Sequence, residues 1–491
     1  MNIVIVAEPG DDWLGRFDGV QTITPSEFMS TADWTLKRGT RIYNLCRSYS
    51  YQSMGYYVSL LAEARGQRPI PDVMTIQDLR GTSAIRLIPP ALEELIQKSL
   101  RSITKDEFVL SVYFGQNVAE KYDRLCKELY GIFQAPLLRF KFTRRSKWRL
   151  RSASAIALNG VPETHREFVA NAASNHFARR SLARVKRQAM RYDMAILHNP
   201  DEGELAPSND VAIKKMIKAA ANAGIAAELI TRHQAGRLLE FDALFIRETT
   251  AVAHHTYRLA RRAEAAGMVV IDDPLSILRC TNKVYLAELL QRAKVPIPKT
   301  IVVHRWNADK VADELSFPCV LKRPDSAFSK GVVKANDAAE LKLRLDEFFD
   351  DSELIIAQEY MLTDFDWRIG ILDGEALFAC KYHMAKGHWQ IAKHSDAGVK
   401  PQFGRCDTLP VELAPAKAVS AAVKAAGLIG NGFYGVDVKE VDGKFFIIEV
   451  NDNPNLDSGV EDDVLKDKLY RIIMESFVRR IEASKQVVNH R

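Results

Sequence analysis

The chain has 491 residues, of which 47% are hydrophobic and 26% are charged. This length leaves room for about two to four domains, each with its own core, and the composition is that of a globular protein. The net charge of +6 is small for a chain of this size. It allows anionic partners such as nucleotides but excludes the strongly basic balance of a dedicated nucleic-acid-binding protein.

The six cysteines are scattered and include no CxxC pair. This pattern indicates reduced thiols rather than a disulfide framework or a zinc site. The opening residues, "MNIVIVAEPG", become acidic too early for a secretory signal, and no apolar run is long enough to span a membrane. We therefore expect a cytoplasmic protein with no membrane partner.

The first part of the chain contains a basic hairpin. The run "LLRFKFTRRSKWRLRSASAIAL" alternates apolar and basic residues on both sides of "RRSK", which predicts two strands with one cationic face. Arg139 and Lys141 lie on one strand, and Arg149 and Arg151 on the other. This face could contact phosphates, although a solvated surface is the simpler interpretation.

From Tyr192 the sequence alternates predicted strands and helices: "MAILHN", "DVAIKKMIKAAANAG", "AAELIT", "FDALFIR", "HTYRLARRAEAAG" and "MVVID". Alternation at this spacing predicts a small open parallel sheet. His254 and His255 are neighbours in this region. We expect them to face different ways, so they would form a poor metal pair and occupy ordinary positions at a helix start.

Two apolar runs near the C-terminus flank an Asp-Gly turn and carry Asp437, Glu449 and Asn451. If residues 442–444 form a three-residue loop, Asp437 lies directly opposite Glu449, and Asn451 shares their face. A two-residue turn would place the two carboxylates on opposite faces. The sequence therefore predicts the three-residue loop if the carboxylates act together.

Paired carboxylates on a half-buried sheet repel each other unless a cation lies between them. Asp, Glu and Asn supply the hard oxygen ligands that Mg²⁺ prefers, so we expect a magnesium–phosphate site. An exposed hairpin whose charges face water is the alternative, and the apolar neighbours of Glu449 count against it. Without metal, repulsion should raise the pKa of both carboxyl groups, and Asp437→Asn should leave the metal-free protein at least as stable.

Two lysines are candidates for binding phosphate. Lys283 and Lys322 each lie at the edge of an apolar segment, although each taken alone could be an ordinary solvated lysine. Lys322 precedes the loop "DSAFSKG", which could close over a triphosphate. The segment "QEYM" (358–361) could offer backbone hydrogen bonds to an adenine.

These strings together resemble the ATP-grasp carboxylate-amine ligases, in particular RimK-like glutamate ligases and glutathione synthetases. The resemblance covers about residues 194–484 and rests on "TNK", "FPCVLKRPDSAFSKGVVK", "QEY", "DWRIGILDGE", "GVDV" and "FIIEVNDNPNL", in that order. The strings "NLCRSYSYQSMGYYVSLLAEARG" and "LLRFKF" resemble the extra N-terminal domain of some RimK-like proteins. The resemblance implies an α/β (α+β grasp) protein with an accessory domain at 1–190, a pre-grasp domain with a small parallel sheet at 191–280 and an ATP-grasp domain at 281–485.

The resemblance also implies a function for the site: phosphorylation of a carboxylate by ATP, followed by attack of an amine on the acyl phosphate. Lys322 and Arg368 would be the catalytic residues, with Arg368 facing the substrate carboxylate or the acyl phosphate. Two Mg²⁺ ions, or Mn²⁺, would be bound. The implied nucleotide ligands are Lys283, Lys322, Glu359, Tyr360, Asp366, Gln390 and Lys393, and the implied metal ligands are Asp437, Glu449 and Asn451, with Glu449 bridging.

The chain departs from the family pattern at three places. Ser326 and Ser329 replace glycines of the flexible loop, an arginine usual after the "GE" strand is replaced near Lys381 and His383, and "NPNLD" replaces a glycine-containing substrate turn. The identity of the small-molecule or peptide substrates therefore stays open, as does a homo-oligomeric state. A glutathione-synthetase-like peptide ligase is one alternative. A ribosome- or RNA-associated ATP-binding protein that uses the basic hairpin is another.

Overall fold

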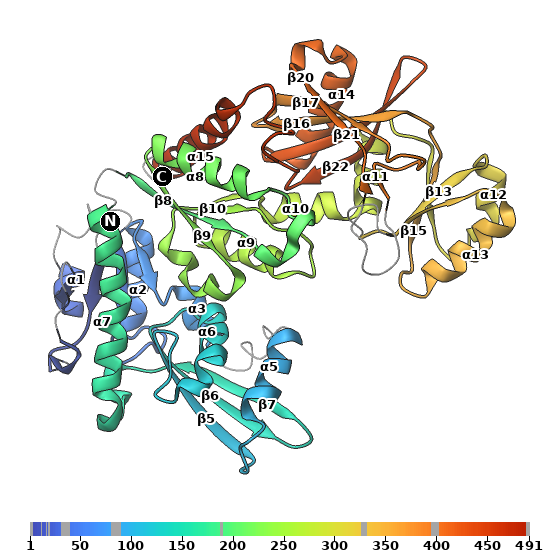
Figure 1. Ribbon diagram of the computed structural model, residues 1–491. Coiled ribbons are helices and arrows are strands. Elements are labelled where there is room, and N and C mark those ends of the chain that lie inside the picture. Colours follow the sequence, from blue (N-terminus) through green and yellow to red (C-terminus); the bar gives the residue numbers. More distant parts are fainter. Residues whose placement is uncertain are drawn as a thin grey trace. The chain divides into compact units, whose positions relative to one another are not determined.

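The computed structural model describes residues 3–10, 12–15, 17, 20–30, 40–79, 90–186, 190–325, 331–393 and 402–487. The chain forms two compact units. The first consists of Met1–Met190 with Ile230–Glu240, and the second of Arg191–Leu229 with Phe241–Asn489. Figure 1 shows both units coloured along the chain.

The first unit begins with a parallel sheet in the order β2-β1-β3-β4. Its core contains Val4, Val6, Phe28 and Ile42, all buried. The apolar run of β1 fits this position, because a parallel strand covered on both faces needs no polar face. The strands are β1 (Ile3–Val6), β2 (Val20–Ile23), β3 (Arg41–Asn44) and β4 (Arg68–Ile70), and the helices are α1 (Pro25–Ser30), α2 (Met54–Ala64) and α3 (Val73–Asp78).

A second, antiparallel sheet of the first unit has the order β5-β6-β7. The predicted basic hairpin is confirmed as β6 and β7: Phe140 and Phe142 are buried, whereas Lys141, Arg149 and Arg151 are exposed. The elements are β5 (Glu107–Tyr113), β6 (Leu137–Arg144), β7 (Trp148–Ala155), α5 (Pro90–Leu100), α6 (Asp123–Ile132) and α7 (Glu163–Lys186).

The second unit begins with a four-stranded sheet in the order β11-β10-β8-β9, in which β10 pairs in parallel with both β8 and β11. The predicted parallel sheet is thereby confirmed. The C-terminal helix α15 packs on it, with the rings of Phe245 and Phe477 5.2 Å apart. The elements are β8 (Tyr192–Leu197), β9 (Ile225–Ile230), β10 (Ala243–Ile246), β11 (Val269–Ile271), α8 (Asp210–Asn222), α9 (His255–Ala265), α10 (Pro274–Thr281) and α15 (Asp467–Val487).

Two antiparallel sheets complete the second unit. The smaller has the order β12-β15-β13-β14 and is covered by α13, whose Leu341, Leu345 and Phe348 are buried. Its elements are β12 (Thr300–Val303), β13 (Cys319–Lys322), β14 (Val332–Ala335), β15 (Ile355–Glu359), α11 (Lys283–Arg292), α12 (Val311–Glu314) and α13 (Ala338–Phe349).

The larger antiparallel sheet has the order β20-β17-β16-β21-β22, and a short pair, β18 and β19, follows β17 in the chain. The mixture of parallel and antiparallel sheets with helices confirms the predicted α/β class. No helix among the described residues has the length and apolar character needed to cross a membrane. The elements are β16 (Phe365–Leu372), β17 (Glu375–His383), β18 (Ala392–Lys393), β19 (Gln402–Phe403), β20 (Cys406–Leu409), α14 (Ala416–Ile429), β21 (Phe433–Val441) and β22 (Lys444–Asp452).

Candidate active site

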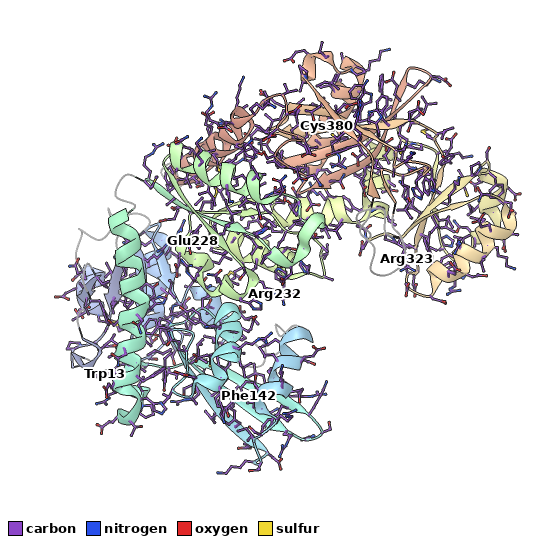
Figure 2. All side chains as sticks on the ribbon, viewed as in Figure 1. Trp13, Phe142, Glu228, Arg232, Arg323 and Cys380 are labelled. Carbon is purple, nitrogen blue, oxygen red and sulfur yellow. The ribbon has the colours of Figure 1, made fainter. Side chains whose placement is uncertain are left out.

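The larger antiparallel sheet has one apolar and one polar face. Its apolar face buries Trp367, Ile369, Val436, Val438 and Val450 against α14. Successive side chains of a strand alternate between faces, so the residues between these point the other way. The result is a row of charged residues across three neighbouring strands, in which Arg368 of β16 pairs with Asp437 of β21 and Asp437 pairs with Glu449 of β22. Cys380 of β17, labelled in Figure 2, lies opposite Arg368 on the same face.

The predicted opposition of Asp437 and Glu449 is confirmed, but the predicted three-residue loop is wrong. Val441 pairs with Lys444, so the turn has two residues, Asp442 and Gly443, both with positive φ (51° and 70°). This conformation is the primed turn that an Asp-Gly pair favours. The register shifts further along, where Val438 pairs with Ile447 and Asp437 with Glu449. Ile448 is therefore the extra residue of a β-bulge, and the bulge brings Glu449 to the face of Asp437.

Each carboxylate of this row has a cationic partner within the chain. Arg368 donates to Asp437 from Nε and, at 2.9 Å, from Nη2 to Oδ2. Lys283 Nζ lies 2.8 Å from Glu449 Oε1. Asn451 Nδ2 donates to Asp437 Oδ2 at 3.2 Å and to the carbonyl of Gly435 at 3.3 Å. Asp437, Glu449 and Asn451 therefore come together as the sequence predicts.

These partners decide the pKa values of the carboxyl groups. Burial raises the pKa of Asp437, and nearby Glu449 adds to this shift while Arg368 opposes it. Burial alone would also raise the pKa of Glu449, but Lys283, Lys322 and Arg368 bring it below its ordinary value. The expectation that repulsion raises both pKa values is therefore wrong for Glu449, because the neighbouring cations outweigh Asp437.

An apolar pocket adjoins the row. Lys283 is the first residue of α11, behind the N-cap Asn282, and Lys322 ends β13. Burial lowers the pKa of Lys322 to about 8, and Lys283 adds to this effect. The bulged Ile448 lines the pocket as well. The lining residues are Lys283, Leu286, Ala287, Leu290, Ile297, Thr300, Lys322, Ile356, Gln358, Ile447 and Ile448.

Asp366 lies on β16, two residues before Arg368, and is buried. Its Oδ1 is 2.6 Å from Lys439 Nζ, which also donates to Thr363 Oγ1 at 2.6 Å. The sequence interpretation missed Lys439, although a lone lysine within the apolar run "GVDVKEV" was an available signal.

The predicted neighbourhood of Lys381 and His383 lies away from the row. Lys381 Nζ lies 4.7 Å from the ring centroid of Phe365, and His383 Nε2 lies 2.9 Å from Asp407. Tyr382 occupies the polar face instead. The Arg368 guanidinium lies 5.0 Å from the centre of the Tyr382 ring. The Tyr382 hydroxyl donates a hydrogen bond to the buried Glu461.

The residues expected at the adenine lie at the ends of strands. Glu359 is exposed at the end of β15, and its Oε2 accepts from the backbone N–H of Lys299 at 3.4 Å. The rings of Tyr360 and Trp389 meet edge to face at 5.8 Å. Gln390 follows directly, and its carbonyl accepts from the N–H of Ala385 at 2.9 Å.

Two predicted features fall on parts of the chain that the structure leaves undescribed. The side chain of Lys393 lies outside the described residues, and so do Ser326 and Ser329 of the "DSAFSKG" loop.

The arrangement has the chemistry of a metal–triphosphate site. Lys283 and Lys322 border an apolar pocket, and Asp437, Glu449 and the amide oxygen of Asn451 lie beside Lys283. Oxygen donors of this kind are the ligands that Mg²⁺ takes together with phosphate oxygens. The residues present therefore fit a magnesium–nucleotide complex.

Comparison with known proteins agrees with this geometry. Residues 25–172 match the family model described as RimK-like ATPgrasp N-terminal domain, and residues 280–473 match that of the RimK-like ATP-grasp domain. A probable alpha-L-glutamate ligase from Marinomonas sp. (strain MWYL1) is 27% identical over 49% of this chain and 78% of its own. The alpha-aminoadipate–LysW ligase LysX from Saccharolobus solfataricus is 27% identical over 39% of this chain and 68% of its own.

Solved structures similar to this chain include D-alanine–D-alanine ligase from Bacillus anthracis, at 19% identity over 61% of this chain and 99% of that one, with a TM-score of 0.46. A RimK domain ATP-grasp protein from Sphaerobacter thermophilus is 16% identical over 58% of this chain and 98% of its own, with a TM-score of 0.43. On these two matches, the chain carries a RimK-like ATP-grasp N-terminal domain at residues 25–172 and a RimK-like ATP-grasp domain at residues 280–473.

Proposed function

We propose that this protein is an ATP-dependent ligase that joins a carboxylate to an amine and releases ADP and phosphate. One observation carries the proposal: Lys283 and Lys322 border an apolar pocket, and Lys283 is paired with Glu449 beside Asp437. A protein that only bound nucleic acid would have no use for paired carboxylates next to two phosphate-binding lysines.

The reaction follows in two steps. A carboxylate oxygen of the acid attacks the γ-phosphorus of ATP while the bond from that phosphorus to the bridging oxygen breaks, which yields an acyl phosphate and ADP. The amine nitrogen then attacks the acyl carbon, phosphate leaves, and the nitrogen loses a proton. Lys283 and Lys322 would offset charge on the phosphates, and Arg368 would face the substrate carboxylate or the acyl phosphate.

We assign the remaining contacts from their positions. Asp437, Glu449 and Asn451 would hold two Mg²⁺ ions, with Mn²⁺ as a substitute, and the bound metal would neutralise charge on the transferring phosphoryl group. Glu359, Tyr360 and Gln390 would lie along the base, and Asp366 would reach the nucleotide through Lys439 or directly. Lys393 completes this proposed set. Its backbone belongs to β18.

The substrate class is proposed from the relatives. The names of two relatives, a probable glutamate ligase and an aminoadipate–LysW ligase, support an amino acid as one substrate and an amino acid or peptide as the other. We propose a cytoplasmic location, where the reduced state of all six cysteines would be kept. We also propose an accessory domain at 1–190, a pre-grasp domain at 191–280 and a grasp domain at 281–485, and the boundary between units near Met190 supports the first of these.

ADP formation tests the proposal. The purified chain with Mg-ATP is offered a panel of acid and amine pairs, and ADP, phosphate and the amide are measured by coupled assay and mass spectrometry. We expect ADP only when both an acid and an amine are present, in a 1:1 ratio with amide. Salt-dependent RNA binding with no ADP from any pair would instead favour the RNA-associated alternative that the exposed Lys141, Arg149 and Arg151 suggest.

A further inference from the structure

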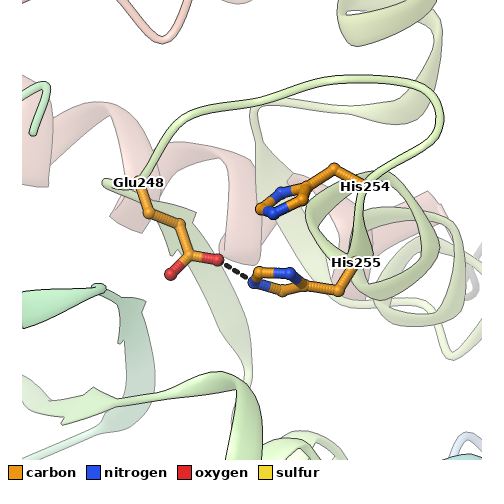
Figure 3. A group of neighbouring side chains, drawn as sticks. All are labelled: Glu248, His254 and His255. Atoms are coloured by element: carbon orange, nitrogen blue, oxygen red, sulfur yellow. Dashed lines mark hydrogen bonds and ion pairs between the residues drawn. The ribbon is translucent and has the colours of Figure 1, made fainter. Parts of the chain in front are cut away.

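Three potential metal ligands meet at one edge of the parallel sheet of the second unit. Glu248 follows the end of β10, and His254 and His255 begin α9. One ligand atom from each of the three lies within 4.8 Å of the other two. Figure 3 shows the two imidazole rings side by side, with the Glu248 carboxylate pointing toward them from the opposite segment.

The neighbouring histidines converge because the chain turns between them. His254 is the N-cap of α9 and has extended backbone angles (φ −92°, ψ 166°), whereas His255 is the first helical residue. Their rings therefore do not alternate as they would in a strand, and the ring centroids are 3.9 Å apart. The expectation that the two histidines face different ways is wrong.

The surroundings hold this group in place. The carbonyl of Glu248 accepts from Asn453 Nδ2 at 2.6 Å, and Asn453 Oδ1 accepts from Arg247 Nη1 at 2.7 Å. The Glu248 side chain is 1% exposed, and that of His255 is 15% exposed. The group is thus fixed and nearly dry, yet His255 still reaches solvent.

The Glu248 carboxylate and the His255 Nε2 are joined by a hydrogen bond. A buried carboxylate requires a cationic partner or hydrogen bonds. Arg247 donates its hydrogen bonds to Ser208, Asn453 and the carbonyls of Pro207 and Pro454. The two imidazoles face the Glu248 carboxylate.

We propose that Glu248, His254 and His255 bind one divalent transition-metal ion of the Zn²⁺ or Co²⁺ class. Two imidazole nitrogens and one carboxylate oxygen form a ligand set that suits such ions and discriminates against Mg²⁺, which prefers oxygen. Binding replaces the proton shared by His255 and Glu248, so that proton is released. Three protein ligands leave a position open for water or for a polar group of a substrate.

The site differs in chemistry from the proposed magnesium site and is connected to it by the chain. Asn453, which fixes the Glu248 carbonyl, lies two residues after Asn451. The inference does not rest on the proposed ligase activity, because metal binding is measured without ATP or substrates.

Cobalt provides the test. The full chain is freed of metal with a chelator and titrated with CoCl₂ in excess MgCl₂, and the visible absorption band of low-coordinate Co²⁺ is followed. We expect one equivalent to bind and to be displaced by ZnCl₂. His255→Gln and Glu248→Gln should each weaken binding by roughly 100-fold. His383→Gln removes another carboxylate-paired histidine of the same unit and should leave binding unchanged, as should Glu449→Gln.

Two results would overturn the proposal: no cobalt band in the unmodified protein, or a band that survives both ligand substitutions. The first would mean that His255 and Glu248 form a structural ion pair only. Should the variants fail to fold, X-ray absorption of the zinc-loaded unmodified protein decides instead. Scattering from two imidazoles supports the site, and an all-oxygen shell contradicts it.

Discussion

Arg368 and Asp437 lie directly opposite each other on β16 and β21 and are joined by two hydrogen bonds from one guanidinium to one carboxylate. Glu449, on the neighbouring strand β22, is likewise paired with a cation, the Lys283 ammonium. The charges of the proposed metal ligands are therefore compensated by the chain itself before any ligand binds. If Asp437 and Glu449 hold a metal ion as proposed, the ion would compete with these partners for the carboxylates, and Arg368 would then be available to an anionic substrate.

The first prediction concerns Asp437→Asn. Because the substitution removes the charge that faces the largely buried side chain of Arg368, the metal-free protein should lose about 1–3 kcal/mol of stability. This reverses the expectation from sequence, which considered only the repulsion by Glu449. Thermal unfolding with and without Mg-ATP measures both effects, and the ligand-induced shift should also shrink. Asp407→Asn, at the solvent-accessible ion pair with Arg405, is the control and should change stability far less.

The second prediction concerns the pH dependence of nucleotide binding. Burial lowers the pKa of Lys322 to about 8, so the free protein carries this charge below that pH and loses it above. Phosphate binding favours the charged form of Lys322. The titration of this lysine should therefore leave nucleotide affinity unchanged below about pH 8 and lower it by up to tenfold per pH unit above that pH.

Calorimetry in buffers of different ionisation heat measures this proton directly. We expect uptake of up to one proton near pH 9 and none near pH 7. Lys322→Arg retains its charge and should abolish the uptake, since an arginine stays protonated throughout this range. Equal proton uptake in this variant would assign the effect to another group.

The third prediction concerns turnover. Glu449→Gln and Lys322→Ala should each lower the rate of ADP formation by roughly 100-fold or more while the protein stays folded, because each removes charge directed at the transferring phosphoryl group. Glu375→Gln, at an exposed position of the same sheet, should keep the normal rate. Near-normal turnover in Glu449→Gln would refute its assignment as a metal ligand.

The fourth prediction concerns Gly435, which pairs with Asn451 and lies on the face of Asp437. A Cβ at this glycine would come within 2.8 Å of Pro454 Cβ and 3.0 Å of Arg368 Cδ. Gly435→Ala should therefore displace Arg368 and lower kcat, while Mg-ATP affinity changes little. Gly427→Ala in α14 meets no atom within 4 Å and is the matched control. An unchanged kcat in Gly435→Ala would show that the position of Arg368 is not critical.

The sequence predicted the larger part of this architecture because its signals are local. Alternation of strand and helix after Tyr192 and the ordered strings of the grasp region specify element types and neighbours. The bulge at Ile448 was not predictable, because the run from Phe445 to Ile448 is uniformly apolar and contains no glycine to mark an irregularity. The sequence therefore led to the correct pairing of Asp437 with Glu449 through the wrong loop.

The sequence also could not predict which side chains from distant segments contact each other. Lys439 meets Asp366 on a neighbouring strand, 73 positions away in the sequence. Its place within an apolar run is a local signal, but that signal does not identify the distant carboxylate that it meets. His254 and His255 were misjudged for a different reason. The rule that neighbours face apart holds within a strand, but these residues lie at the start of a helix.

The bulge also restricts how this hairpin can vary in length. Between Asp437 and Glu449 stand eleven residues, two of which form the turn while one, Ile448, belongs to no pair. A regular ladder through all eleven residues would place Glu449 opposite Val436, on the packed face, so the unpaired Ile448 is what keeps Glu449 opposite Asp437. Deleting Ile448 alone would leave eight paired residues and the two-residue turn, and Glu449 would still lie opposite Asp437 without a bulge. An engineer grafting this hairpin should therefore keep Ile448 and the bulge together or remove both.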